Sequence, residues 1–405
     1  MVTGAGRAIG DLEALLAREG YHERPLAVLY LDAFDANAAD LARRAAGTPL
    51  RVASKSLRVR GLLERVLARP GYAGILAFTL PEALWLVEHG ARDVLVAYPT
   101  VERGALRRLA MLPAALEAIT LMVDETAQLE LILDATSDLR ARRVSRPIRV
   151  ALELDVAYAP LPGVRFGALR SPLRSPGQAV ALARQVQARP ALELVGLMAY
   201  EGQIAGVTDA AATAYGAAVR TMKRLSRPDI AERRAEAVAA VRRIADLEFV
   251  NGGGTGSIES TAAEEAVTEI AAGSGLIGPG LFDRYRDFAP HPALLLGVSV
   301  VRRPAPGVAT LLGGGWIASG VPGPDRLPTI AHPPGLSFAP QEAAGEVQTP
   351  VLGPAAERLR VGDTVWLRHA KAGEPAEHFA HYLLVRGDEI VGSHPTYRGE
   401  GAVFL

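Results

Sequence analysis

The 405-residue sequence contains no cysteine, which excludes disulfide bonds, thiolate metal sites and a cysteine nucleophile. It also lacks an excess of charge of either sign, because 44 basic residues balance 44 acidic ones. No dense basic block and no interleaving of aromatic and basic residues occurs, so we expect no nucleic-acid partner. No apolar run reaches membrane-spanning length and no signal-peptide pattern is present, so we expect a cytoplasmic protein without a membrane partner.

The glycines of the first ten residues are spaced like those of a dinucleotide-binding loop. Such a loop works only where a buried strand delivers it to the start of a helix. No strand precedes the glycines here. We therefore expect residues 1–25 to be a lead segment, flexible until a helix over 11–18.

From Leu26 onward, short apolar runs alternate with amphipathic helical segments, and a turn or capping residue closes each run. The runs are 26–32, 50–56, 74–80, 93–99, 118–124, 149–155, 192–200, 247–253 and 276–282. This alternation predicts an α/β fold with a parallel sheet, which eight units close into a (β/α)8 TIM-type barrel. We assign 50–56 as the first barrel strand and 276–282 as the eighth, and leave 26–32 outside the ring. An open doubly wound sheet is the alternative.

Two further segments complete the predicted organisation. Residues 230–244 are rich in arginine and glutamate, and we interpret them as an amphipathic helix with a solvated charged face. After Tyr285, proline, glycine and β-branched residues increase, and runs such as 294–301 and 382–385 are typical of antiparallel strands. We therefore predict a barrel domain over 26–285 and a mainly-β C-terminal domain over 286–405.

Lys55 lies near the end of the otherwise apolar run 50–56, where an ammonium group costs desolvation and should serve a purpose. Working groups of such barrels lie at the C-terminal ends of the strands, and loops after strands seven and eight often hold phosphate. The seventh predicted strand leads into a glycine-rich loop over 250–257, whose N–H groups can turn toward one anion. A flexible turn is the alternative. Strands one and seven are close neighbours around the ring, which favours a phosphate site beside the lysine.

These two motifs, Ala53-Ser-Lys-Ser56 and Gly252-Gly-Gly-Thr-Gly256, resemble those of the alanine-racemase-like (fold type III) pyridoxal-phosphate enzymes. Within that fold the chain looks most like the D-threonine aldolase and D-serine dehydratase branch. Gly196–Gly202 is similar to the branch's Gly-Leu-x-x-Tyr-x-Gly segment. Pro279–Asp283 resembles its strand-eight Pro-Gly-x-Tyr pattern, with a phenylalanine in the tyrosine's place.

The resemblance implies that Lys55 forms a Schiff base with pyridoxal 5'-phosphate and later moves a proton at Cα. It implies that Tyr200 lies near the cofactor ring and Arg170 near its phenolate or ring-nitrogen edge, with Arg165 as the alternative arginine. Simple packing for Tyr200 and a surface position for Arg170 are the competing interpretations. The phosphate contacts are assigned to Gly253, Gly254, Thr255 and Ser257.

Histidines gather late in the chain, where the family binds a divalent metal through a His-x-Cys or His-x-Asp pair. His369 matches the first ligand, but Lys371 stands at the second, and a protonated lysine repels a cation. Either Glu374 or Glu377 replaces the missing ligand, or the Lys371 ammonium takes over the electrostatic role of the metal; we favour the second. We interpret three of the other late histidines as ordinary surface or strand residues: His378, His381 and His394.

The resemblance implies a lyase that acts on a small-molecule substrate, a D-configured β-hydroxy amino acid. Such an enzyme either cleaves the substrate to glycine and an aldehyde or dehydrates and deaminates it to a keto acid and ammonia. An amino acid racemase and a non-catalytic pyridoxal-phosphate carrier are the alternatives. Members of the family pair so that the β-domain of one chain covers the barrel of another, which implies a homodimer.

Overall fold

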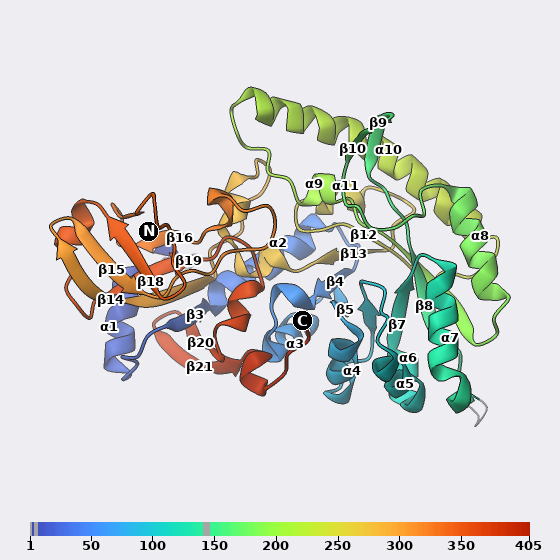
Figure 1. The fold of residues 1–405 in the computed structure, drawn as a ribbon, viewed down its shortest axis with the longest axis horizontal. Coiled ribbons are helices and arrows are strands. Elements are labelled where there is room, and N and C mark those ends of the chain that lie inside the picture. Colours follow the sequence, from blue (N-terminus) through green and yellow to red (C-terminus); the bar gives the residue numbers. More distant parts are fainter. Residues whose placement is uncertain (1, 4–6, 141–145) are drawn as a thin grey trace. The chain divides into compact units, whose positions relative to one another are not determined.

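The computed structural model describes residues 2–3, 7–140 and 146–405, and the chain divides into two compact units (Figure 1). The first, here called the β unit, comprises Met1–Asp40, Ser56–Glu64 and Ser274–Val403. The second, here called the barrel unit, comprises Leu41–Lys55, Arg65–Gly273 and Phe404–Leu405.

The N-terminal segment is described only in part. Residues 1 and 4–6, which belong to the predicted flexible lead, lie outside the described residues. Strands β1 (Val2–Thr3) and β2 (Arg7–Ala8) pair in antiparallel fashion, and helix α1 (Ile9–Arg18) follows directly. The predicted helix over 11–18 is therefore present.

Eight parallel strands form a closed barrel within the described part of the barrel unit. Their order around the ring is β4 (Leu50–Ala53), β5 (Tyr72–Ala77), β6 (Val94–Val96), β7 (Ile119–Val123), β8 (Ile148–Glu153), β11 (Leu192–Ala199), β12 (Phe249–Gly252) and β13 (Glu269–Ala272). Strands β4, β6 and β7 are buried throughout, as expected of parallel strands covered on both faces. The closed ring confirms the predicted barrel and excludes the open doubly wound sheet.

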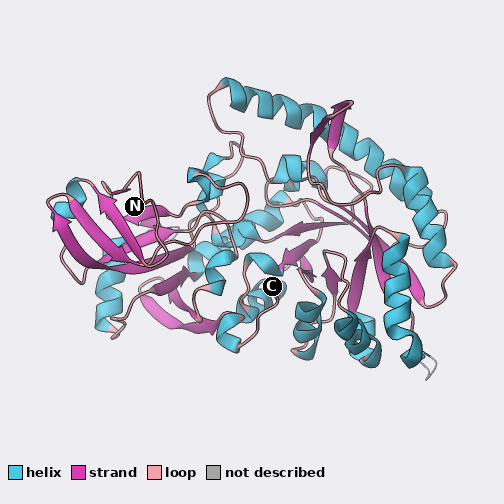
Figure 2. Ribbon diagram, in the orientation of Figure 1, coloured by secondary structure: helices cyan, strands magenta, loops and turns pink. Residues whose placement is uncertain are grey.

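Helices follow the barrel strands and flank the ring (Figure 2). Side chains cap three of them: Thr79 caps α4, Thr213 caps α10, and Ser175 forms a capping box with Gln178 at the start of α8. Helix α2 (Leu31–Arg44) follows β3 (Leu26–Tyr30) instead of a barrel strand. The helices after it are α3 (Arg60–Leu67), α4 (Leu80–Glu88), α5 (Arg103–Met111), α6 (Pro113–Ala118), α7 (Thr126–Arg140), α8 (Pro176–Gln187), α9 (Gly202–Ala205), α10 (Ala214–Val241) and α11 (Ile258–Ala262). No helix among the described residues has the length and apolar character that crossing a bilayer requires.

The eighth barrel strand is not the predicted one. Strand β13 closes the ring by pairing with β12 and β4, whereas the run 276–282 contributes to two short 3-10 helices, Ser274–Ile277 and Gly280–Arg284. Gly278 has φ of +58°, and Pro279 has no N–H to donate, so this run cannot form a ladder. The resemblance of Pro279–Asp283 to a strand-eight motif is therefore wrong in its placement.

The β unit is built on a nine-stranded sheet whose centre includes the early strand β3 (Leu26–Tyr30). This strand pairs antiparallel with β14 (Leu294–Ala305) and parallel with β20 (His381–Arg386). The run 26–32 thus lies outside the ring, as predicted. The division of the chain falls between Gly273 and Ser274, earlier than the predicted boundary near residue 286. The other strands are β15 (Val308–Leu312), β16 (Thr329–His332), β17 (Ser337–Phe338), β18 (Gln348–Leu352), β19 (Thr364–Arg368) and β21 (Glu389–Pro395).

Candidate active site

Lys55 lies in a short 3-10 turn, Ser54–Ser56, that directly follows the buried strand β4. The turn is anchored because the Ser54 hydroxyl donates a hydrogen bond of 3.1 Å to the carbonyl of Leu76. The Lys55 side chain is exposed, and its Nζ donates to the Tyr98 hydroxyl at 2.7 Å. Tyr98 follows strand β6, so the pair lies at the C-terminal ends of two barrel strands, where such barrels place their chemistry.

Arg170 completes this cluster with Tyr200, which follows strand β11. The Arg170 Cζ lies 5.4 Å from the centre of the Tyr98 ring and 5.1 Å from that of Tyr200, within cation–π range of both. Burial raises the pKa of Tyr200 to about 12, with Arg170 acting in the opposite direction. The structure therefore brings together three of the predicted residues, Lys55, Arg170 and Tyr200, around a tyrosine that was not predicted.

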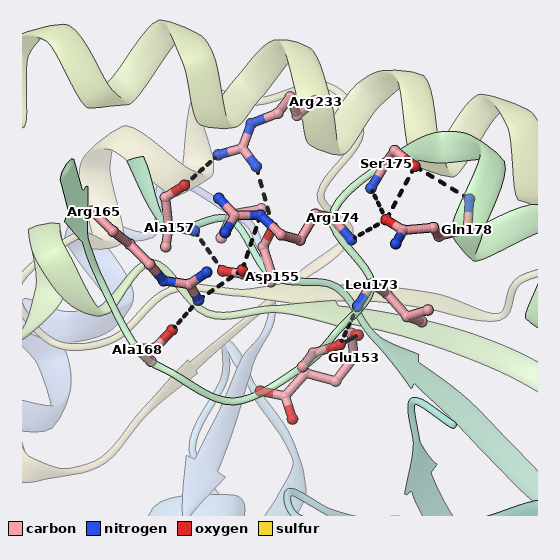
Figure 3. Close-up of polar contacts among 12 residues, drawn as sticks. Glu153, Asp155, Ala157, Arg165, Ala168, Leu173, Arg174, Ser175, Gln178 and Arg233 are labelled. Carbon is pink, nitrogen blue, oxygen red and sulfur yellow. Dashed lines mark hydrogen bonds and ion pairs between the residues drawn. The ribbon is translucent and has the colours of Figure 1, made fainter. Parts of the chain in front are cut away.

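Arg165, the alternative arginine, forms an ion pair with Asp155. Its Nη2 lies 2.7 Å from Oδ2 of the buried Asp155 and donates to the carbonyl of Ala168 at 2.8 Å. Arg174 also approaches Asp155, at 3.5 Å. Figure 3 shows both arginines directed at this carboxylate. Of the two candidates, only Arg170 contacts the tyrosine rings beside Lys55 among the described residues.

Glu153, at the end of β8, was also missed by the sequence reasoning. Its side chain is directed away from Asp155 and its arginines (Figure 3), and the residue is only 4% exposed. Burial raises the pKa of this carboxyl from 4.5 to about 7, and the Arg170 charge opposes the shift. Glu153 is thus a buried acid within electrostatic reach of the cluster.

The glycine-rich loop follows β12 and depends on one residue with a left-handed backbone. Gly253 has φ of +84°, and a Cβ there would lie 2.6 Å from Cγ2 of Ile270. Its N–H donates to Oε2 of Glu201 at 3.1 Å, and the Ser257 hydroxyl donates to Oε1 at 2.8 Å. The Gly254 N–H donates to Ser257 Oγ at 3.1 Å. Three of the predicted phosphate donors therefore have partners within the protein.

Glu201 owes its buried position to Arg234 of helix α10. The two residues are 1% and 0% exposed, and Nη2 of Arg234 lies 2.7 Å from Oε2 of Glu201. Arg234 also donates to the carbonyl of Ala199 at 2.9 Å and pairs with Glu264. The charged face predicted for 230–244 is therefore not solvated throughout, because this arginine fixes the glycine loop through Glu201.

Thr255 is the remaining predicted phosphate ligand. Its carbonyl accepts a hydrogen bond of 2.7 Å from Nη2 of Arg44, whose Nε lies 2.6 Å from Oε1 of Glu259. The loop is thus tied to charged side chains at two points.

His369 and Lys371 belong to the β unit, just after β19. The His369 ring is buried, and neither nitrogen has a hydrogen-bond partner among the described residues. Burial lowers the pKa of this imidazole to about 3, and the neighbouring Arg368 adds to the shift. Lys371 Nζ donates to the carbonyl of Ser319 at 3.0 Å, and the Ser319 N–H donates to Glu374 at 3.0 Å.

A metal of the family type does not fit this donor set. Glu377 pairs with Arg58, and the described residues contain no cluster of three or more metal-ligating side chains. A buried neutral imidazole is a good ligand, but His369 has a cationic lysine where its partner should stand. The assigned roles of His369 and Lys371 stay predictions.

The family profile described as "Alanine racemase, N-terminal domain" matches residues 29–278. The chain belongs to this family. It is 27% identical over 277 residues to a 3-hydroxy-D-aspartate aldolase of Paracoccus denitrificans, covering 67% of this chain and 65% of that protein. It is 27% identical over 276 residues to a D-threonine aldolase of Arthrobacter sp., covering 66% of this chain and 64% of the relative. The match thus spans less than two thirds of each curated relative.

Solved structures agree on the fold. D-threonine aldolase from Filomicrobium marinum superposes with a TM-score of 0.77 at 22% identity, covering 94% of this chain and 96% of that one. D-threo-3-hydroxyaspartate dehydratase from Delftia sp. HT23 gives 0.68 at 20% identity, covering 92% and 97%. These findings confirm the resemblance to the D-threonine aldolase branch of alanine-racemase-like proteins.

Proposed function

We propose that the protein is a pyridoxal-phosphate-dependent lyase that acts on a D-configured β-hydroxy amino acid. The observation that carries this proposal is the ε-amino group of Lys55, 2.7 Å from the Tyr98 hydroxyl at the C-terminal ends of two barrel strands. The two curated relatives, both aldolases for D-amino acids, support the substrate class.

The residues at the barrel fit the cofactor. Bound pyridoxal phosphate would supply an electron sink for the substrate α-carbon. Lys55 would attach it because its amine is exposed beside the cluster, while Arg170 and Tyr200 would border the ring. Thr255 would hold the phosphate, and Gly253, Gly254 and Ser257 would shape its loop through their contacts with Glu201 and with one another.

Side chains of the protein would carry out the remaining steps. Lys55 takes or returns a proton at the substrate Cα, and Arg170 offers positive charge that no carboxylate among the described residues neutralises within ion-pair distance. We propose that the Lys371 ammonium stabilises negative charge on the substrate β-oxygen, and that His369 assists it. Cleavage of either bond, Cα–Cβ or Cα–H followed by loss of the β-hydroxyl, needs a group that stabilises negative charge on the β-oxygen.

A substrate screen that measures aldehyde and ammonia separately tests the function. We expect the full-length protein to be yellow and to release one of these products from D-configured β-hydroxy amino acids, but not from their L-enantiomers. Lys55→Ala should lose both colour and activity because the attachment point is gone. Colour without turnover would identify a carrier, and interconversion of enantiomers without either product would identify a racemase.

We also propose that the protein works as a cytoplasmic homodimer, as the family resemblance implies. Light scattering on the purified protein measures the mass directly. A monomeric mass at micromolar concentration would contradict the dimer without affecting the proposed chemistry.

A further inference from the structure

Tyr98 is held rigidly at the position where it accepts the Lys55 hydrogen bond. The three residues of β6 before it are buried, and the N–H of Ala97 donates to the carbonyl of Ala77 at 2.8 Å. The Lys55 Nζ lies 2.7 Å from the Tyr98 oxygen and 5.4 Å from the centre of its ring. The amine therefore approaches the hydroxyl and not the face of the ring.

Four titratable groups face Tyr98 from three barrel strands or the segments that follow them: Lys55, Glu153, Arg170 and Tyr200. Two of them are cations, whereas Glu153 has a raised pKa of about 7 and Tyr200 one of about 12. Burial alone would raise the pKa of the Tyr98 phenol, but Lys55 and Arg170 together lower it below its ordinary value. Lys55 and Arg170 thus make the Tyr98 phenol more acidic than an ordinary tyrosine.

The chain's two other lysines make contacts of other kinds. Lys223 is buried in an ion pair of 2.9 Å with Asp209, and Lys371 donates to a backbone carbonyl. A phenolate can accept a proton from an ammonium, and the resulting phenol can return it to the amine.

We propose that Tyr98 is the proton partner of Lys55, holding its ε-amino group in place and exchanging a proton with it. In the forward step an N–H bond of the ammonium breaks and an O–H bond forms on the phenolate, leaving a neutral amine and a neutral phenol. The reverse step restores the charges. A neutral amine is the form that attacks a carbonyl or accepts a proton. The exchange stands on the geometry alone; its use at the substrate Cα rests on the proposed function.

The exchange can be tested without any substrate by following the ionisation of tyrosine by ultraviolet absorbance as the pH is raised. The full-length protein is first freed of any bound pyridoxal phosphate. The chain has 10 tyrosines, so the Tyr98 signal is the difference between the wild type and Tyr98→Phe. We expect this signal to appear at lower pH than that of an ordinary tyrosine, and to move to higher pH in a Lys55→Met background. A Tyr98 signal that ionises at or above the ordinary pH, or that ignores Lys55→Met, overturns the proposal.

Turnover supplies the second readout. With a substrate in hand, Tyr98→Phe should lower kcat by about 100-fold, change KM little and remove one limb of the pH profile. Tyr215→Phe, which removes an exposed hydroxyl on α10, is the matched control and should behave like the wild type. Wild-type rates and an unchanged pH profile in Tyr98→Phe would overturn the proton role. If the wild type itself turns over no substrate, the proposed function fails while the titration still decides on Tyr98.

Discussion

The backbone N–H of Gly253 donates to the carboxylate of Glu201 at 3.1 Å, so a buried side chain and not a bound anion orients the first donor of the glycine-rich loop. The same carboxylate accepts the Ser257 hydroxyl and is neutralised by Arg234. The loop is thus preorganised by the protein before any phosphate arrives, and this arrangement makes its own predictions.

Removing the Glu201 charge should destabilise the fold and loosen the loop. Glu201→Gln leaves Arg234 buried with only Glu264 as an ionic partner. We expect a loss of about 3 kcal/mol in the free energy of unfolding, measured by urea denaturation, and weaker binding of pyridoxal phosphate. Glu236→Gln, at an exposed position on α10, the helix that carries Arg234, should change the free energy of unfolding by less than about 0.5 kcal/mol. Equal stability of the two variants would contradict the role of Glu201.

Adding a methyl group to the loop should be costly at Gly253 in particular. Gly253→Ala combines a left-handed backbone with a Cβ 2.6 Å from Ile270, whereas Gly90→Ala has φ of +98° and nothing within 4 Å. We expect about 1 kcal/mol of destabilisation for Gly90→Ala and about 3 kcal/mol for Gly253→Ala, the difference being steric. Thermal and urea unfolding of both variants measure it. If Gly253→Ala costs no more than its control, the loop can move away from β13.

Glu153 should make stability depend on pH. Its pKa in the folded protein, about 7, lies above the ordinary 4.5, so the folded state binds this proton more tightly than the unfolded chain. The stabilisation is therefore complete below about pH 4.5 and is lost as the pH rises through about 7, amounting to about 3 kcal/mol. Glu153→Gln should remove this dependence and be more stable than the wild type at about pH 8. Parallel pH profiles for both proteins would refute the assignment.

The lysine at the second metal position predicts that activity does not need a divalent ion. Chelation should leave the lyase rate largely intact, and Lys371→Met should reduce it because the charge at the β-oxygen is lost. Lys371→Asp restores the family's His-x-Asp spacing with His369, so this variant should become dependent on an added divalent ion. Complete loss of wild-type activity on chelation, with recovery on adding the ion, would show that a ligand other than Lys371 has replaced the missing one.

The ring was predictable because seven of its strands lie within short, mainly apolar runs that alternate with helical segments along the sequence. Strand β13 was not predicted because its first residue is Glu269, so the segment does not begin as an apolar run in the sequence. In the structure the charge of Glu269 is neutralised by Arg51 at 2.7 Å. The next run, 276–282, is apolar but contains Gly278 and Pro279, which prevent a strand. Hydrophobicity alone could not decide between the two.

The site was predictable only where a residue type is tied to one chemistry. Lys55 and the glycines stood out, but Tyr98 did not, since a tyrosine at a strand end normally indicates packing. The two candidate arginines could not be separated because the ion pair of Arg165 with Asp155 depends on the hairpin of β9 (Tyr158–Leu161) and β10 (Val164–Phe166), which carries Arg165. A charged residue on an amphipathic helix is usually solvated, so the burial of Arg234 could not be predicted from the sequence.

Strand β3 lies between β14 and β20, although it precedes both by more than 250 residues. During synthesis this almost wholly apolar strand therefore has no strand to pair with until β14 has been translated, and its second neighbour, β20, is made only near the end of the sequence. A chain cut short before residue 381 would leave one edge of β3 permanently uncovered, open to pairing with other molecules. Expression of the barrel residues by themselves should begin after β3, at residue 41, to avoid aggregation.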